Sequence, residues 1–328
     1  MPHVVIAGKI HEAGVALLKG TAGFTLDVVE EVSLASYVPF MPKADALLIR
    51  TQACTAEVIA TAPNLKIVSR HGVGYDAVDV AALNARKIPL AIVGDVNSRA
   101  VAEHALTLML AAARRVVAHD VASRSGKWNE RNKFDAVELD GKRLLVIGYG
   151  RIGRRVAELG KAFGMSIAAY DPFVKDLPEM KVDLRAALAE ADVVSLHMPA
   201  AKSPVIGAAE MAMMKPSAII INAARGGLVD EAALEAALRA RKLYAAGLDV
   251  LVDEPPKADH PLMSNPYTTF SPHNAGLTQE CARRMAIAAA QNIIDCFAGE
   301  LDAKLVVNSK DCLLPLREKV DRAQARDG

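Results

Sequence analysis

Short runs of aliphatic residues alternate with longer Ala- and Leu-rich stretches along most of the chain. Runs that are apolar on both faces are typical of strands in a parallel sheet that helices cover on both sides. Such runs predict strands over 4–7, 46–49, 66–69, 90–93, 143–147, 166–170, 192–196, 218–222, 245–249 and 268–270. The pattern therefore predicts an α/β protein with doubly wound parallel sheets.

The predicted strands form two series with a long helix between them. This helix begins near residue 98, continues to about residue 123 and is apolar around most of its circumference. A helix of that kind is buried between domains or between subunits, so we expect a homodimer built around 98–119. A second long helix, over 279–298, leads back to the first series. We therefore expect one domain of residues 1–98 plus 279–328 and another of residues 99–278, joined by these two helices.

Composition narrows the classes of partner. The 328 residues include 39 Lys and Arg against 38 Asp and Glu, without the basic excess of proteins that bind nucleic acids or anionic membranes. Apolar residues make up 52% and charged residues 23%, which excludes a disordered chain. The longest apolar stretch, over 105–113, is too short to cross a bilayer, and the N-terminus lacks the features of a secretion signal. We expect a cytoplasmic protein with no nucleic-acid or membrane partner.

The cysteines give no sign of a metal site or a disulfide framework. The chain has four, Cys54, Cys281, Cys296 and Cys312, and none belongs to a Cys-x-x-Cys pair. Four scattered thiols in a chain of this length are typical of a reducing compartment. We expect reduced, mostly buried thiols and no metal.

A glycine motif carries the sharpest local signal. Gly148-Tyr149-Gly150-Arg151-Ile152-Gly153 follows the predicted strand 143–147 and opens a predicted helix. In that context the first glycine allows a tight turn, the second lets the backbone approach a pyrophosphate, and the third lets helix and strand pack closely. The free N–H groups of the helix can then bind the phosphates. The motif predicts a dinucleotide-binding Rossmann domain within 99–278.

An acidic residue at the end of the next strand indicates which dinucleotide binds. Asp171 lies 23 residues after Gly148 and ends the predicted strand 166–170. A carboxylate at that place can accept hydrogen bonds from both ribose hydroxyls, and it repels a 2′-phosphate. The sequence therefore predicts NAD rather than NADP as the cofactor.

Three ionisable side chains follow three strands of the second series. Arg225 lies after strand 218–222, Glu254 lies after strand 245–249, and His273 lies after strand 268–270. Since parallel strands present their carboxyl ends at one edge of the sheet, we expect the three side chains to converge. A guanidinium can hold a carboxylate in a bidentate contact. An imidazole can exchange a proton with an oxygen, and a carboxylate beside it orients the ring and favours its charged form.

The order and spacing of these motifs resemble the D-isomer-specific 2-hydroxyacid dehydrogenase family, which includes D-3-phosphoglycerate dehydrogenase and glyoxylate/hydroxypyruvate reductase. Glu254 lies 29 residues after Arg225, and His273 lies 19 residues after Glu254. Both spacings are of the kind that this family shows. The resemblance extends over residues 1 to about 308, and it rests on six segments in the family's order: 70–76, 97–104, 148–153, 222–230, 249–255 and 271–276.

The resemblance implies a role for each matched residue. Arg225 resembles the arginine that anchors the substrate, Glu254 the carboxylate partner, and His273 the acid/base. Asp249 resembles the aspartate near the nicotinamide end of the cofactor. The Gly72-Val73-Gly74 turn resembles the loop whose backbone N–H groups receive the substrate carboxylate, which suits a glycine loop.

The resemblance also implies further cofactor contacts, and the chain departs from the family at one of them. The additional positions are Arg151, Ile152, His197, Pro199, Ala223, Ala224 and Gly276, and Arg225 and His273 are expected to contact the cofactor as well. After Pro199, many relatives carry a Leu-Thr pair where this chain has Ala200-Ala201. The departure weakens any prediction of side-chain hydrogen bonds from that loop.

The sequence does not identify the acid that reacts. Arg50 and Arg70 could bind a second anionic group such as a phosphate, or could equally form structural salt bridges. Hydroxypyruvate, glyoxylate and 3-phosphoglycerate are the leading candidates. The resemblance implies a flavodoxin-like substrate domain, and we expect no regulatory domain like that of longer phosphoglycerate dehydrogenases.

Two other functions remain open at this point. The same scaffold occurs in corepressors that sense NAD(H) without catalysis, and these can retain the arginine, glutamate and histidine. A formate dehydrogenase is a weaker alternative, because its active-site pattern differs. Oxidation of NADH by 2-oxo acids would separate an enzyme from a binding protein. His104, on the apolar helix, is interpreted as an interface histidine rather than a catalytic group.

Overall fold

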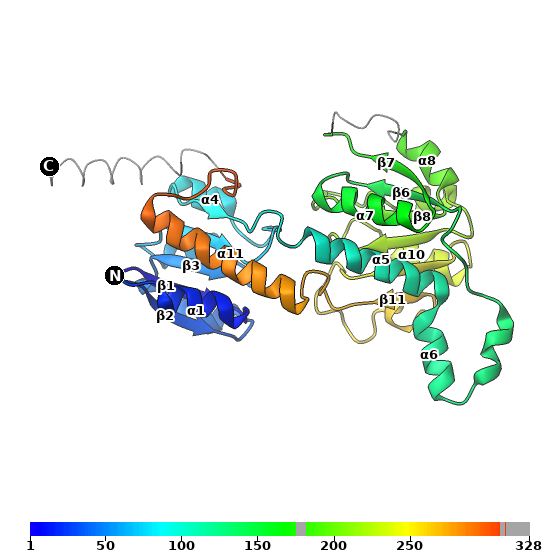
Figure 1. The fold of residues 1–328 in the computed structure, drawn as a ribbon, viewed down its shortest axis with the longest axis horizontal. Coiled ribbons are helices and arrows are strands. Elements are labelled where there is room, and N and C mark those ends of the chain that lie inside the picture. Colours follow the sequence, from blue (N-terminus) through cyan, green and yellow to red (C-terminus); the bar gives the residue numbers. More distant parts are fainter. Residues whose placement is uncertain (175–181, 309–311, 313–328) are drawn as a thin grey trace. The chain divides into compact units, whose positions relative to one another are not determined.

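The computed structural model describes residues 1–174, 182–308 and 312. Within these residues the chain divides into two compact units (Figure 1). Unit 1 comprises Met1–Asn97 together with the chain from Gln279 onward, and unit 2 comprises Ser98–Thr278. Each unit contains its own parallel sheet. No helix among the described residues is long and apolar enough to cross a membrane.

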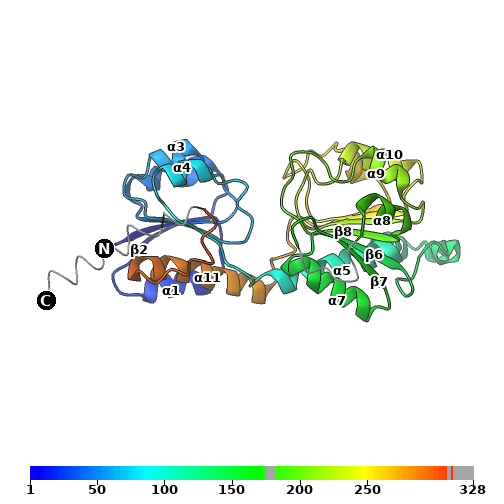
Figure 2. The same cartoon turned by 90° about the horizontal axis from the view of Figure 1, so that it is seen from above.

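Unit 1 is built on a five-stranded parallel sheet in the flavodoxin-like order β2-β1-β3-β4-β5. Its strands are β1 (His3–Ala7), β2 (Thr25–Val29), β3 (Ala46–Ile49), β4 (Ile67–Arg70) and β5 (Leu90–Ala91). Its helical elements are α1 (Glu12–Gly20), α2 (Leu34–Tyr37), the 3₁₀ helix η1 (Val38–Lys43), α3 (Ala56–Ala60), α4 (Val80–Ala85) and α11 (Gln279–Ala298). Figure 2 shows α1 and α11 on one face of the sheet and α3 and α4 on the other. The strand order reverses between β1 and β3, which favours ligand binding at the carboxyl edge there.

The apolar pattern missed one strand of unit 1. β2 pairs only with β1, at the edge of the sheet, and its residues are partly or fully exposed. An edge strand need not be apolar on both faces, so the criterion that found the other strands failed for this one. The apolar pattern also predicted a strand over 90–93, which is longer than the observed β5 (Leu90–Ala91). The ladder ends at Ala91, and the N–H of Ile92 bonds instead to the carbonyl of Leu305 in the returning chain.

Unit 2 is built on a six-stranded parallel sheet in the order β7-β6-β8-β9-β10-β11. Its strands are β6 (Arg143–Ile147), β7 (Ser166–Tyr170), β8 (Val193–Leu196), β9 (Ile219–Asn222), β10 (Ala245–Leu248) and β11 (Thr268–Phe270). Its helical elements are α5 (Ser98–Arg114), α6 (Val116–Arg124), η2 (Trp128–Lys133), α7 (Arg151–Ala162), α8 (Leu184–Glu190), α9 (Ala208–Met213), α10 (Glu231–Arg239) and η3 (Pro261–Ser264). α5 and α7 cover one face, and α8, α9 and α10 cover the other (Figure 2).

The long helix predicted over 98–123 is two helices. α5 ends at Arg114, and Arg115 adopts a left-handed conformation with φ +51° before α6 begins. The Nε of Arg115 lies 3.1 Å from the carboxylate of Asp135, which fixes the break. No periodicity of apolar residues reports such a break, because it depends on a partner twenty residues away.

The apolar circumference of α5 is covered by unit 2 itself. α5 packs on α7 and on strands β9, β10 and β11, and ten of its residues are buried there. Much of the helix is therefore covered within its own unit, and the expectation that a second subunit also contacts it stays a prediction. The second long helix, α11, packs on α1, β3 and β4 of unit 1.

In unit 1 the close approach of α1 and α11 depends on a glycine. A Cβ on Gly14 would lie 2.6 Å from the carbonyl oxygen of Ala286 in α11. Backbone cannot move aside as a flexible side chain can, so a larger residue there must push the two helices apart.

We expect Gly14→Ala to destabilise unit 1 by about 1–3 kcal/mol, the usual cost of overpacking, despite the better helix propensity of alanine. Gly20→Ala is the matched control, because no described atom lies within 4 Å of its added Cβ. Urea unfolding followed by circular dichroism would measure both variants. Equal midpoints for the two variants would contradict this account of the helix contact.

Candidate active site

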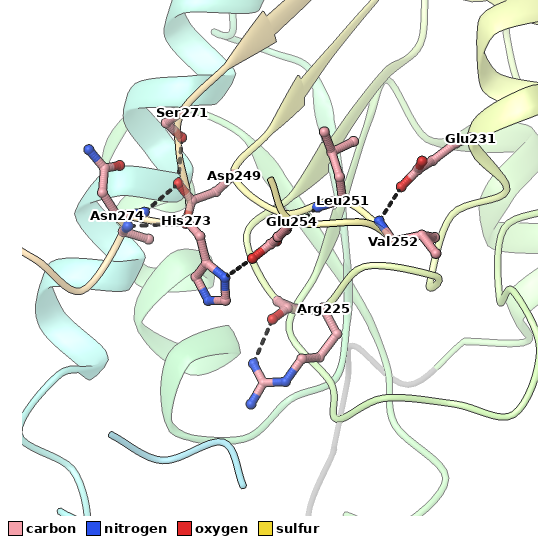
Figure 3. Close-up of polar contacts among 11 residues, drawn as sticks. Arg225, Glu231, Asp249, Leu251, Val252, Glu254, Ser271, His273 and Asn274 are labelled. Carbon is pink, nitrogen blue, oxygen red and sulfur yellow. Dashed lines mark hydrogen bonds and ion pairs between the residues drawn. The ribbon is translucent and has the colours of Figure 1, made fainter. Parts of the chain in front are cut away.

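The loops after β9, β10 and β11 bring the predicted ionisable side chains to one edge of the sheet in unit 2. Leu248 at the end of β10 is in register with Asn222 at the end of β9 and with Phe270 at the end of β11. Arg225, Glu254 and His273 lie on the loops that begin at these three ends (Figure 3). The parallel register thus accounts for their convergence.

His273 and Glu254 form a close pair. The Nδ1 atom of His273 lies 2.5 Å from Oε2 of Glu254, and the other carboxylate oxygen accepts the N–H of Leu251 at 3.0 Å. Burial raises the pKa of Glu254, but the hydrogen bonds from His273 and Leu251 outweigh it and hold that pKa below its ordinary value. The glutamate is therefore ionised at neutral pH and fixes the orientation of the imidazole ring.

The loop that carries Arg225 is fixed by the side chain of Asn222. Its amide nitrogen donates to the carbonyl of Arg225 at 2.8 Å, and its oxygen accepts the N–H of Ala224 at 3.1 Å. The guanidinium of Arg225 donates to the carbonyl of Ala224 at 2.6 Å.

At Gly226 the backbone of the Arg225 loop packs closely against the backbone of the Glu254 loop. A Cβ on Gly226 would lie 2.0 Å from the carbonyl oxygen of Leu251, so only glycine allows the two backbones to touch. The arginine loop and the glutamate loop are therefore held together by backbone contact.

A second glutamate supports the Glu254 loop, and the sequence analysis missed it. Glu231, the first residue of α10, accepts the N–H of Val252 at 2.7 Å (Figure 3). Its other oxygen lies 3.1 Å from Nε2 of His260. An acidic residue in the first turn of a helix is commonly explained by the helix dipole alone. The partners of Glu231, Val252 and His260, lie far from it in the sequence, so the residues around Glu231 did not indicate its role.

Asp249 holds the loop that carries His273. Its side chain is almost fully buried, and it accepts the hydroxyl of Ser271 at 2.6 Å and the N–H groups of Asn274 and Ala275 at 3.0 Å each. Its backbone carbonyl accepts the N–H of His273 at 2.8 Å. Burial raises the pKa of Asp249, but the surrounding donors outweigh it and lower that pKa. The sequence identified this aspartate but not the loop that it organises.

The glycine motif has the geometry of a dinucleotide loop. Gly148 has φ +91°, and a Cβ on it would lie 2.6 Å from the carbonyl oxygen of His197. A Cβ on Gly153 would lie 2.0 Å from the carbonyl oxygen of Gly148, which brings α7 close against the loop. Gly150 precedes α7, and no described atom lies within 4 Å of its Cβ position, which leaves room for a phosphate.

The carboxylate of Asp171 lies beside that loop. It accepts the N–H groups of Tyr149 at 2.8 Å and Phe173 at 2.9 Å. This side chain is thus fixed next to the glycine turn, where the ribose of a dinucleotide would bind.

The other predicted cofactor positions lie around the same edge of unit 2. His197 is partly buried, burial lowers its pKa to about 3, and its Nε2 lies 2.8 Å from the hydroxyl of Ser195. It is therefore neutral and cannot attract a phosphate by charge. The remaining positions are Arg151 and Ile152 at the start of α7, Pro199 after β8, the buried Ala223 and Ala224 after β9, and Gly276 after β11.

The predicted substrate residues of unit 1 follow β3 and β4. Arg50 comes directly after β3 and donates to the carbonyl of Lys9 at 2.9 Å, and Arg70 ends β4 and donates to the carbonyl of His71 at 3.0 Å. Burial lowers the pKa of Arg50, but a guanidinium stays charged at physiological pH. The Gly72-Val73-Gly74 turn comes next, with Gly72 at φ +151°.

His71 lies next to the two arginines and is buried. Burial, with Arg50 and Arg70 nearby, lowers its pKa to about 4, so the ring is neutral at physiological pH. Neither ring nitrogen has a hydrogen-bond partner among the described residues. The histidine therefore adds no charge to that of the arginines beside it.

The structure shows no metal centre in the part of the chain that it describes. There, no three His, Cys, Asp or Glu side chains are grouped as metal ligands. The four cysteines are buried, and none of them forms a disulfide with another described residue.

Comparison with known proteins identifies the family of unit 2. Residues 106–275 match the family described as "D-isomer specific 2-hydroxyacid dehydrogenase, NAD binding domain". The cofactor is therefore NAD.

Curated relatives and solved structures are similar over almost the whole chain. D-3-phosphoglycerate dehydrogenase of Archaeoglobus fulgidus is 40% identical over 304 residues, which are 90% of this chain and 57% of that protein. The chain thus spans little more than half the length of that relative. The TT0316 protein from Thermus thermophilus superposes with a TM-score of 0.86 at 33% identity, covering 92% of this chain and 98% of that one. D-lactate dehydrogenase from Aquifex aeolicus, complexed with NAD and lactic acid, superposes with a TM-score of 0.84 at 26% identity, covering 93% and 99%.

The charge of Asp171 predicts a preference between the two nicotinamide cofactors. We expect NADH to bind about ten- to a hundredfold more tightly than NADPH, because the 2′-phosphate would face this carboxylate. Asp171→Asn removes the charge but keeps an acceptor for the backbone, so the preference should shrink. Dissociation constants from nucleotide fluorescence would measure it.

Asp183→Asn is the control for that experiment, since Asp183 only caps α8 and asparagine caps equally well. Equal affinity of the unaltered protein for NADH and NADPH would contradict the prediction.

Proposed function

The chain belongs to the D-isomer-specific 2-hydroxyacid dehydrogenase family, and from this premise we propose that it interconverts a small (R)-2-hydroxy acid and its 2-oxo acid with NAD as cofactor. The observation that carries the proposal is the 2.5 Å contact between His273 and Glu254, next to the Arg225 loop of an NAD-binding unit. An oriented acid/base and a guanidinium are what reduction of a 2-oxo acid requires.

His273 supplies the proton in the direction of reduction. Bound NADH provides the hydride for C2, and negative charge then develops on the carbonyl oxygen. Because Nδ1 is engaged by Glu254, Nε2 of His273 is the atom that donates to this oxygen. The ionised Glu254 stabilises the charged imidazole before transfer, and in the reverse direction it favours uptake of the proton from the hydroxyl group.

Arg225 holds the carboxylate of the acid. A guanidinium can bind a carboxylate through two parallel N–H···O bonds, which fixes both position and orientation. The loop around Arg225 is held by Asn222 and Gly226, so little conformational freedom is lost when substrate binds. In unit 1, we propose that Arg50 and the backbone N–H groups of Gly72-Val73-Gly74 bind an anionic group.

Among the candidate acids we favour one with a second anionic group, such as 3-phosphoglycerate. Two arginines at the carboxyl edge of β3 and β4 support this choice, and the name of the relative that is 40% identical points the same way. Hydroxypyruvate and glyoxylate, each with NADH, are the comparison substrates in the direction of reduction. NADH that binds but is oxidised by none of the 2-oxo acids would favour the alternative, a non-catalytic NAD(H)-sensing protein.

We also propose that the protein is a homodimer built around the helix segment 98–119, with α6 and η2 contributing to the contact. Neither α6 nor η2 buries a residue against the described part of the chain. Five large apolar residues of this segment are exposed: Val116, Val117, Val121, Trp128 and Phe134. A short helix without a buried face is not stable in water, so a second copy of the chain supplies the missing contact.

We expect His273→Ala to lower kcat by about 10²–10⁴-fold through loss of the general acid. Arg225→Ala should act mainly on KM for the acid, because it removes an anchor that binds substrate and transition state alike. His3→Ala is the control, since His3 also pairs with a carboxylate, Asp27, at 3.0 Å, but in unit 1. Steady-state NADH oxidation would test all three, and an active His273→Ala would refute the assignment.

Glu254→Gln should shift the pH profile of reduction downward. The amide keeps a hydrogen-bonding group near His273 but no longer stabilises the charged ring, so the proton donor is lost at lower pH. The pKa of Glu254 lies below its ordinary value of 4.5, so the glutamate does not itself titrate in the assay range. Profiles measured in both directions would show the shift, and an unchanged profile would mean that Glu254 does not tune His273.

Val121→Asp should weaken the proposed dimer, because Val121 is 62% exposed within the apolar segment. Val32→Asp is the matched control, because Val32 is 63% exposed on unit 1. Light scattering after size-exclusion chromatography would measure the mass of each. A monomeric mass for the unaltered protein at micromolar concentration would refute the proposal.

A further inference from the structure

A hydrogen-bonded chain of three side chains lies behind the loop that carries His273. The Nε2 atom of His104, on α5, lies 2.7 Å from the hydroxyl of Ser271 and 3.4 Å from Oδ1 of Asp249. The hydroxyl of Ser271 in turn lies 2.6 Å from the same oxygen of Asp249. All three residues belong to unit 2.

The direction of these hydrogen bonds follows from the number of protons. Ser271 has a single hydroxyl proton, and the buried carboxylate of Asp249 is the stronger acceptor. That proton therefore goes to Asp249, and His104 donates its Nε2–H to the oxygen of Ser271 at 2.7 Å, with Oδ1 of Asp249 as a second, more distant acceptor at 3.4 Å. Donation to the hydroxyl oxygen polarises the hydroxyl and strengthens the bond that it makes.

Asp249, the last member of this hydrogen-bonded series, holds the backbone of His273 in an unfavourable conformation. His273 has φ +49°, a left-handed value that costs free energy in any residue other than glycine. Asp249 compensates through its bonds to Ser271, Asn274 and Ala275, which flank His273, and through its backbone carbonyl (Figure 3). The position of the imidazole therefore depends on how Asp249 is oriented.

Asp249 needs donors because it is buried. Burial raises the pKa of Asp249, and the hydrogen bonds from His104 and Ser271 are the largest of the effects that lower it. Among the donors to Asp249, Ser271, Asn274 and Ala275 belong to the loop that carries His273, whereas His104 belongs to α5. The hydrogen bond from His104 therefore connects that loop to the helix.

We propose that His104 is a positioning residue of the reaction: through Ser271 and Asp249 it keeps the His273 loop in the geometry that presents the imidazole to the substrate. The inference rests on the proposed function, and it gives His104 a role beyond that of an interface histidine, because its hydrogen bond to Ser271 lies within its own unit. His104 acts through Ser271 and Asp249, and the proposal places it in contact with no reacting atom.

Two substitutions of His104 separate hydrogen bonding from packing. His104→Phe keeps a planar ring but cannot donate, and we expect kcat to fall about tenfold while KM for NADH changes little, since the imidazole is misplaced and the cofactor site is intact. His104→Gln restores a donor on a side chain of similar reach, and should recover most of the lost kcat. Ser271→Ala removes the middle of the chain and should resemble His104→Phe.

Thr107→Val is the control on the same helix. Thr107 lies one turn from His104 on α5, is exposed, and bonds through its hydroxyl to the carbonyl of Glu103. We expect its kinetic constants to equal those of the unaltered protein.

Amide hydrogen exchange gives a readout that does not require turnover. In His104→Phe the peptide N–H groups of Asn274 and Ala275 should exchange about tenfold faster, because their acceptor is no longer held in place, while amides of β9 keep their protection. His104→Gln should exchange like the unaltered protein. Faster exchange throughout unit 2 would mean general destabilisation and would overturn the proposal.

The combined results distinguish this inference from the proposed function. If no 2-oxo acid oxidises NADH in the unaltered protein, the dehydrogenase proposal fails, whatever the exchange data show. If the unaltered protein is active and His104→Phe matches it in kcat and in exchange, the positioning role fails while the dehydrogenase stands. Equal losses in His104→Phe and His104→Gln would also overturn it, because donation would then be irrelevant.

Discussion

A buried carboxylate can remain charged only if the protein surrounds it with donors, and this requirement organises the candidate active site. Asp249 is only 2% exposed at the end of β10. Leaving its charge without partners would cost several kcal/mol, far more than any single hydrogen bond returns. The donors come from α5 and from the loop after β11. Satisfying the aspartate therefore fixes the path of the loop, and the path of the loop fixes His273.

Features that depend on local sequence could be predicted, and features that depend on distant partners could not. The strands of unit 2 are short apolar runs covered on both faces, so pattern alone identified all six. The glycine turn around Gly148 and the convergence of Arg225, Glu254 and His273 follow from what comes directly after each strand. The break at Arg115 and the edge strand β2 were missed, because one depends on Asp135 and the other lies where the apolar rule does not apply.

The supporting residues of the site show the same limit more sharply. His104 and Ser271 are 167 positions apart, and Glu231 and Val252 are 21 apart. Nothing in the neighbourhood of His104 distinguishes it from other histidines on an apolar helix. The residues proposed to touch substrate follow strand ends and can be recognised by their position in the sequence, whereas the residues that hold them in place become visible only when the chain is folded.

The contact between Gly226 and Leu251 means that the proposed substrate anchor and the proposed acid/base pair cannot vary independently. The two loops touch through their backbones, so a change in the length or path of one displaces the other. Redesign of the pocket for a different acid would have to exchange residues 222–227 and 249–254 together, as one cassette, with glycine retained at position 226.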